Sequence, residues 1–265
     1  MKRFTQLLSL LSLLFLPARA PAVPPQQVID AQCRSHLFAG ASKLGKDTIK
    51  QLGKCHSQRL NGQLPASTDC NQESNAPWAH LRQRDADSLH VRARKRCIFY
   101  WPASPPATLG FLSCPAPCNT QVPTITTYAD VADCIECRTY RIAENLSTAV
   151  FGTPTLPAGD EEPCWARLTR VVRHYIGAVL KAQRACQLKK DKGALPPSVD
   201  CRTYDPKGRV AKAADLIASG VAYCSDGDLV ALDSCGETGT EEQQCMRDEI
   251  NAATHALFEA VYGAP

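Results

Sequence analysis

The chain has 265 residues and a formal net charge of +4, which falls close to +1 without the three basic residues among its first twenty. A balance this near to neutrality excludes the general electrostatic case for a nucleic-acid-binding protein. Fourteen cysteines, an even number and several times ordinary usage, indicate a disulfide framework in an exported chain.

Residues 1–20 have the pattern of a secretory signal peptide. Lys2 and Arg3 precede an apolar run, and the string Ala18-Arg19-Ala20 offers a cleavage site after Ala20. The apolar run is shorter than the ~20 residues that a bilayer crossing needs, and no later segment is apolar over that length. We therefore expect a secreted or periplasmic protein with no membrane span in the mature chain.

The mature chain contains an internal repeat. The string GQLPASTDC at 62–70 returns 131 positions later as GALPPSVDC at 193–201, and in both copies the first three cysteines are separated by 22 and 15 positions. A second block, 134–154, aligns without gaps on 245–265. These matches predict two tandem cysteine-rich units.

The two predicted units are 21–155, which has the longer loops, and 156–265. Each unit is expected to contain three helices, which in the second unit span about 163–190, 207–223 and 240–263. Apolar residues step by three or four along the first of these helices, and Thr240 with Gln243 matches a capping box for the third. No convincing two-residue alternation occurs, so the expected fold is all-α.

The cysteine spacing restricts the disulfide pairing. Two cysteines 22 positions apart on one helix lie about 33 Å apart along its axis, too far for a bridge. If the first two helices of a unit are antiparallel, Cys186 pairs with Cys201 and Cys55 pairs with Cys70. Each bridge closes a loop worth about 3 kcal/mol in the chain-entropy model. The repeated string is then the stapled corner between two helices.

The remaining pairs are less constrained. We favour Cys164 with Cys245 and Cys224 with Cys235. By repetition, the first unit gains the pairs Cys33 with Cys134 and Cys97 with Cys114. Cys118 and Cys137 have no counterparts and are left for each other.

Patterns that would indicate metal, cofactor or catalytic chemistry are weak. The spacing of Cys114, Cys118, Cys134 and Cys137 suits a four-thiolate zinc site, but export and the partial counterpart in the second unit oppose it. The acidic string SDGDLVALD at 225–233 lacks the ligand order of a calcium loop. The six histidines show no metal-binding spacing, and no nucleophile or phosphate-loop motif occurs. We predict no metal, no cofactor and no catalytic residue.

The unduplicated part of the first unit is the best functional pointer. The basic string VRARKRC at 91–97 is followed by IFYWP, in which Phe99, Tyr100 and Trp101 are candidate ligand contacts that can stack on a sugar or grip a peptide. The alternative is that these rings form a small core beneath a disulfide-tied loop, and that the basic string is the solvated face of a helix.

The cysteine order, the G-x-L-P-x-S-x-D-C corner and the closing AVYG helix resemble the tandem cysteine-rich helical repeats of hypothetical secreted bacterial proteins. This resemblance implies the fold and export, and no activity. We expect a non-catalytic exported module with a binding or structural role, whose partner is an extracellular or periplasmic protein, a glycan or a small apolar ligand. The alternatives are a carrier of apolar ligands, which requires a sizeable apolar cavity, and a hydrolase or inhibitor that uses the 97–137 loop.

Overall fold

The structure, a computed structural model, describes residues 25–72, 79–152 and 162–263, and the predicted signal peptide lies outside them. The described residues form helices and loops and contain no strand. The α-helices are α1 (Gln26–Leu60), α2 (Ala79–Ala93), α3 (Tyr128–Phe151), α4 (Glu162–Asp191), α5 (Arg209–Val221), α6 (Asp226–Ala231) and α7 (Gly239–Tyr262). A short π-helix, η2 (Arg94–Phe99), continues α2, and two 3₁₀ turns, η3 (Pro106–Leu109) and η4 (Cys118–Thr120), lie in the loop before α3. The all-α prediction is confirmed.

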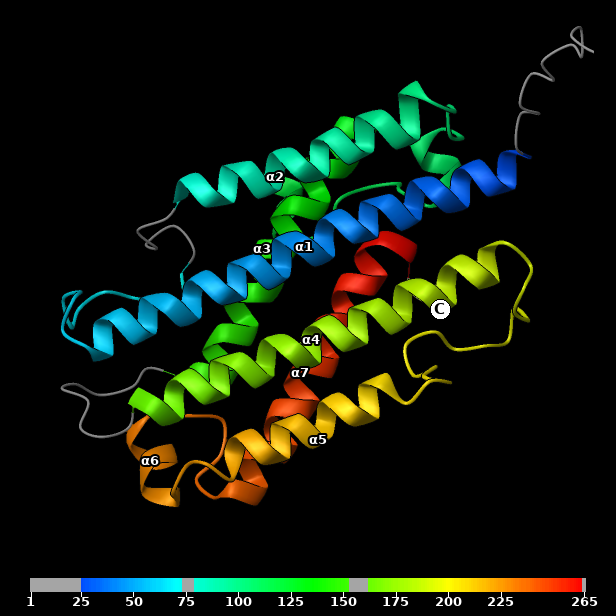
Figure 1. Cartoon of the computed structure of the whole chain (residues 1–265). Helices are drawn as coiled ribbons and strands as arrows, with labels where there is room; N and C mark the ends of the chain where they lie inside the picture. The colour runs from blue at the N-terminus through cyan, green and yellow to red at the C-terminus, as the bar shows by residue number, and fades with distance from the viewer. Residues whose placement is uncertain (1–24, 73–78, 153–161, 264–265) are drawn as a thin grey trace, which may run out of the picture.

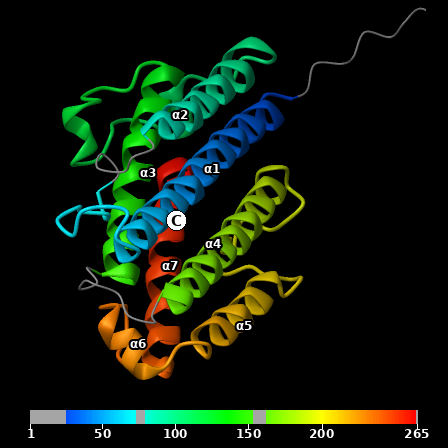
Figure 2. The ribbon, with the colours of Figure 1, turned by 60° about the vertical axis from the view of Figure 1, so that its left-hand side comes forward.

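The helices form two layers. In the first, α2, α1, α4 and α5 lie side by side in that order, each antiparallel to its neighbour (Figure 1). In the second, α3 and α7 run antiparallel to each other and cross behind the row (Figure 2). Helices that the sequence repeat predicts to be equivalent are neighbours in space, α1 with α4 and α3 with α7.

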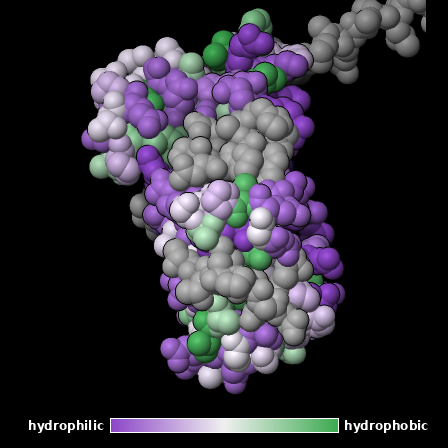
Figure 3. Space-filling view, turned by 90° about the vertical axis from the view of Figure 1, so that its left-hand side faces the viewer, coloured by the Kyte–Doolittle hydropathy of each residue, from purple (hydrophilic) through white to green (hydrophobic). Residues whose placement is uncertain are grey.

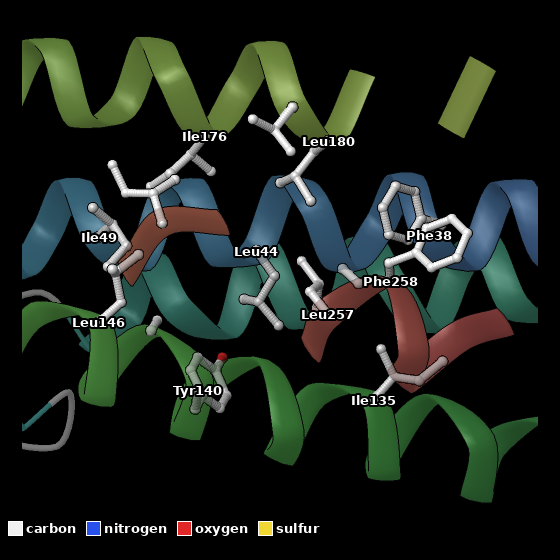
Figure 4. Packing of buried hydrophobic residues seen from close by; sticks show 14 of the residues in the cluster. Phe38, Leu44, Ile49, Ile135, Tyr140, Leu146, Ile176, Leu180, Leu257 and Phe258 are labelled. Atoms are coloured by element: carbon white, nitrogen blue, oxygen red, sulfur yellow. The ribbon is translucent and has the colours of Figure 1, made fainter. Parts of the chain in front are cut away.

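One buried hydrophobic cluster includes side chains from both halves of the chain. In its centre, Phe38 and Leu44 of α1 meet Leu257 and Phe258 of α7, and side chains of α3 and α4 close the sides (Figure 4). The rings of Phe38 and Phe258 are 5.8 Å apart, edge to face. Neither half buries its apolar faces alone.

Seven disulfides join all fourteen cysteines. The bridges Cys55–Cys70, Cys186–Cys201 and Cys118–Cys137 are those expected from the sequence. The other four expected pairs are wrong. The structure has Cys33–Cys97 and Cys164–Cys224 in place of Cys33–Cys134 and Cys164–Cys245, and Cys114–Cys134 and Cys235–Cys245 in place of Cys97–Cys114 and Cys224–Cys235.

The helical hairpin in each half accounts for the observed pairing. Because α2 returns antiparallel to α1, the residues that follow α2 come to lie beside the start of α1, and Cys97 reaches Cys33. The same geometry of α4 and α5 brings Cys224 to Cys164. The cysteine at the start of α3 or α7 is then tied to the loop that precedes its own helix.

The two corners that carry the repeated string have the same local geometry. Gly62 and Gly193 end α1 and α4 with φ angles of 68° and 72°, a left-handed conformation that suits glycine. The carboxylates of Asp69 and Asp200 each accept the backbone N–H two residues later at 3.0 Å, which closes an Asx turn. The corners are structural, as the sequence predicts.

One expected helix cap is wrong. Thr238, not Thr240, caps α7, and its side chain and that of Glu241 form the reciprocal capping box. Both threonines match the local rule, so the sequence could not separate them. The same device starts α3, where Thr127 pairs with Asp130. Among the described helices, none combines the length and the apolar character that a bilayer crossing requires.

Candidate functional site

The exposed apolar side chains are unevenly distributed. The end of the molecule where α1 finishes and α4 begins is mainly hydrophilic in its described part, with small, separate hydrophobic spots (Figure 3). Most of the large exposed hydrophobic residues lie instead in or after α2, in the first half of the chain: Val91, Ile98, Phe99, Tyr100 and Leu112. This is the part of the chain that the sequence singles out.

Phe99 and Tyr100 project from a segment that is fixed at both ends. Cys97 is buried against α1 through its bridge to Cys33, and because neighbouring side chains of a helix point in different directions, the rings that follow it face away. Beyond the rings, both carboxylate oxygens of Asp30 accept hydrogen bonds from Ser104, one from its N–H and one from its hydroxyl, each at 2.8 Å. The rings are therefore held outward by the framework.

The exposed fractions are 68% for Phe99 and 60% for Tyr100, whereas Trp101 is half-buried. The alternative in which all three rings form a small core is thus wrong for the first two. Leaving a large apolar side chain in water forgoes about 1.5–3 kcal/mol relative to burial, so two adjacent exposed rings on a fixed segment need an explanation.

Cations surround the two rings. The guanidinium carbon of Arg94 lies 6.0 Å from the centre of the Phe99 ring, and that of Arg96 lies 5.3 Å from the Tyr100 ring. Burial, followed by the charges of Arg96, Arg184 and Arg92, lowers the pKa of His36 to about 4. We call the exposed set the aromatic–basic surface; it consists of Arg94, Lys95, Arg96, Ile98, Phe99 and Tyr100.

Two open hollows flank this surface. One, of about 420 Å³, is lined by Arg94, Lys95, Phe99 and Tyr100. The other, of about 480 Å³, runs between α2 and the start of α3 and includes His90, Ile98 and Tyr128. Arg94 lines both, so a ligand that lies across the hollows passes its guanidinium.

A side-chain cluster that the sequence did not reveal lies at the second hollow. His90 Nε2 of α2 is 3.0 Å from Glu136 Oε2 and 3.4 Å from Asp133 Oδ1, both on α3. The cluster braces α2 against α3, and its three atoms can also serve as ligands of a divalent cation. The spacing of Asp133 and Glu136 on one helix face was readable, but His90 is more than forty positions away and joins them only through the fold.

The metal patterns considered in the sequence have other roles. Cys114 and Cys118 are bonded to Cys134 and Cys137, so the zinc-like set offers no free thiolate. The acidic string at 225–233 begins the short helix α6. There Ser225 and Asp228 form a capping box, and Asp226 accepts the backbone N–H of Gly239 at 3.0 Å.

His56 belongs to a buried hydrogen-bond network. His56 donates its Nε2–H to Asn71 Oδ1 at 2.9 Å, and Asn71 Oδ1 also accepts the Ser147 hydroxyl at 2.8 Å. All three side chains are buried, and burial lowers the pKa of His56 to about 4. No histidine with an acid and a serine or free thiol lines the described hollows.

The apolar space between the helices is small. A cavity of about 30 Å³ lies among α1, α3, α4 and α7, lined by Ile49, Leu146, Ile176 and Leu257 with their neighbours. Pockets for small ligands are typically about ten times larger or more. Among the described residues, this space is smaller than the sizeable apolar cavity that a carrier of apolar ligands requires.

Comparison with protein-family models, with curated proteins and with solved structures finds no match to this chain. The resemblance to tandem cysteine-rich helical repeats therefore stays a prediction.

Proposed function

We propose that this chain is an exported binding module without catalytic activity, built by duplication of a disulfide-stapled helical unit, and that it recognises an acidic glycan. Export is supported by the signal-like N-terminal segment and by seven disulfides, which persist in oxidising compartments. Duplication is supported by the equivalent corners and by the same three bridges in each half.

The observation that carries the binding proposal is the fixed exposure of Phe99 and Tyr100 among cations. A pyranose ring has an apolar face that an aromatic ring covers, and its hydroxyls stay in contact with water. Guanidinium groups pair with carboxylate or sulfate in two-point contacts. The open hollows suit an extended chain of sugars better than a compact apolar ligand.

The segment is also preorganised. Because the Cys33–Cys97 bridge and the Asp30–Ser104 hydrogen bonds hold both ends, the rings lose little freedom when a ligand binds. The second half has no equivalent of this surface, because Cys224 is followed by the acidic string SDGDLVALD and not by adjacent aromatic residues. One unit then supplies the binding surface, and the other completes the shared core.

The test is calorimetric titration of the mature, oxidised protein with an oligogalacturonate and with a neutral maltooligosaccharide of equal length. We expect binding of the acidic oligomer only. Phe99→Ala/Tyr100→Ala should weaken it at least tenfold, whereas the control Leu216→Ala/Tyr223→Ala, which removes two exposed hydrophobic residues from the second half, should change it less than twofold.

Equal affinity for both oligomers, or equal losses in both variants, would contradict the proposal. Helical circular dichroism and the mass of the intact oxidised chain establish that each variant is folded. Binding that survives in 1 M NaCl would also count against an acidic ligand, because salt screens such pairs.

A further inference from the structure

A second site candidate lies on the other side of α1, away from the aromatic–basic surface and independent of the function proposed above. α1, α4 and the first residue of α5 enclose a groove of about 480 Å³. Its lining includes Gly177, which has no side chain, and Ala178, whose side chain is a single methyl group. The rest of the lining is polar or charged and consists of Lys46, Asp47, Arg170, Arg173, His174, Lys181 and Arg209. We call it the basic groove.

The cations converge because of helix periodicity and packing. Arg170, Arg173 and Lys181, with His174, follow one another at intervals that place them along one side of α4. Lys46 comes from the antiparallel α1, and its stem passes over Gly177, where an added Cβ would lie 3.8 Å from its Cδ. Three helices thus direct positive side chains into one space.

The lysine and arginine side chains of the groove have no ion-pair partner among the described residues. Asp47, the one carboxylate in the lining, already pairs with Lys43 at 3.0 Å. Among the described residues, no acidic side chain forms an ion pair with any of the five lysine and arginine side chains of the groove. The mature chain as a whole is close to +1, so this concentration is local and not a reflection of a basic protein.

We propose that the basic groove binds a ligand carrying two or more phosphate groups. Several unpaired cations in one concave space repel one another, and a multiply charged anion relieves that repulsion. Guanidinium groups match phosphate oxygens in paired hydrogen bonds, and three of the five cations are arginines. The lining has few apolar side chains, so the anionic groups, rather than an attached apolar part, supply the recognition.

The contacts come from side chains alone. The backbone N–H groups of Arg209 and Val210 at the start of α5 are not available to a ligand, because they donate to the Asp205 carboxylate at 2.9 and 2.7 Å. Binding should therefore depend steeply on salt. Because the groove spans α1 and α4, a bound anion also joins the two halves of the chain and should raise the unfolding temperature.

The experiment titrates the mature oxidised protein with inorganic pyrophosphate and with orthophosphate, by calorimetry in 50 mM NaCl. We expect pyrophosphate to bind at least tenfold more tightly than orthophosphate. The variant Arg170→Gln/Arg173→Gln/Lys181→Gln should lose at least tenfold. The control Arg167→Gln/Lys189→Gln/Lys212→Gln removes the same charge from exposed positions outside the groove and should lose less than twofold.

A second arm identifies the source of the phosphate. Co-sedimentation with vesicles that contain cardiolipin, whose headgroup carries two phosphate groups, but not with phosphatidylcholine vesicles, indicates a lipid headgroup when it is lost only in the groove variant. Pyrophosphate binding without co-sedimentation indicates a soluble phosphate ligand. Equal losses in the two triple variants, or binding of neither probe by the folded wild-type protein, would overturn the proposal.

Discussion

Glu242 is a buried carboxylic acid, and its replacement by glutamine should change the pH dependence of stability. The side chain is fully buried in the first turn of α7. One carboxylate oxygen accepts the N–H of Gly236 at 2.7 Å, and the other has no hydrogen-bond partner. Burial raises the pKa of this group from 4.5 to about 7.

The sign and size follow from proton linkage. Between pH 4.5 and 7 the folded chain keeps a proton on Glu242 that the unfolded chain has lost, so stability falls as pH rises through this window. A shift of this size corresponds to about 3 kcal/mol, fully expressed by pH 8. Glu242→Gln removes the ionisation, and any constant cost of the amide is the same at both ends of the window.

The assay is urea unfolding of the oxidised protein at pH 4.5 and at pH 8. The free energy of unfolding of Glu242→Gln minus that of wild type should be about 3 kcal/mol larger at pH 8 than at pH 4.5, because only wild type loses stability over this range. Glu237→Gln, an exposed substitution in the adjacent loop, should show a difference that is the same at both pH values. A difference for Glu242→Gln that does not change with pH would refute the reasoning.

Three further outcomes are expected. Burial lowers the pKa of His56 to about 4, so as pH falls below 6.5 the histidine is protonated in the unfolded chain before it is protonated in the folded chain, and stability drops by up to about 3 kcal/mol. Urea unfolding at pH 4 and at pH 7 should show this drop in wild type and not in His56→Gln. Gly53→Ala places a Cβ 2.5 Å from an α4 side chain and should lower the melting temperature, at a cost of about 1–3 kcal/mol, whereas Gly177→Ala, in ordinary contact, should not. Cys33→Ser/Cys97→Ser removes the bridge between two cysteines 64 positions apart and should lower the free energy of unfolding, measured with denaturant, by about 4 kcal/mol. An unchanged free energy of unfolding in that variant would contradict the stapling role.

Local features of the fold were readable in the sequence, and features that depend on the packing of distant helices were not. The corner at Gly62 and the bridge Cys55–Cys70 follow from glycine, proline and a short loop. The antiparallel hairpin brings Cys97, Cys114 and Cys134 to the end of the unit where Cys33 lies. Which of them bonds Cys33 depends on how α3 packs against the hairpin, which no local pattern encodes. The prediction transferred the pairing of the second unit to the first, so the same error occurs in both halves.

The sites show the same division. The composition of the Phe99–Tyr100 segment marked it as unusual, but the sequence does not show whether these rings are buried or exposed. The Cys97 anchor decides which way they face. For the basic groove, the helical spacing of the α4 cations is visible in the sequence. Lys46 and Arg209 come from helices on either side, and their convergence is a property of the packing.

The central claim is that each half of the chain is stapled by its own disulfides, and the disulfide map tests it most directly. Proteolysis of the oxidised mature protein without reduction, followed by mass spectrometry, should yield linked peptides for Cys33 with Cys97 and for Cys164 with Cys224, and no free thiol. Peptides that join Cys33 to Cys134, or a titratable thiol in the folded protein, would contradict the arrangement that holds Phe99 and Tyr100 on the surface.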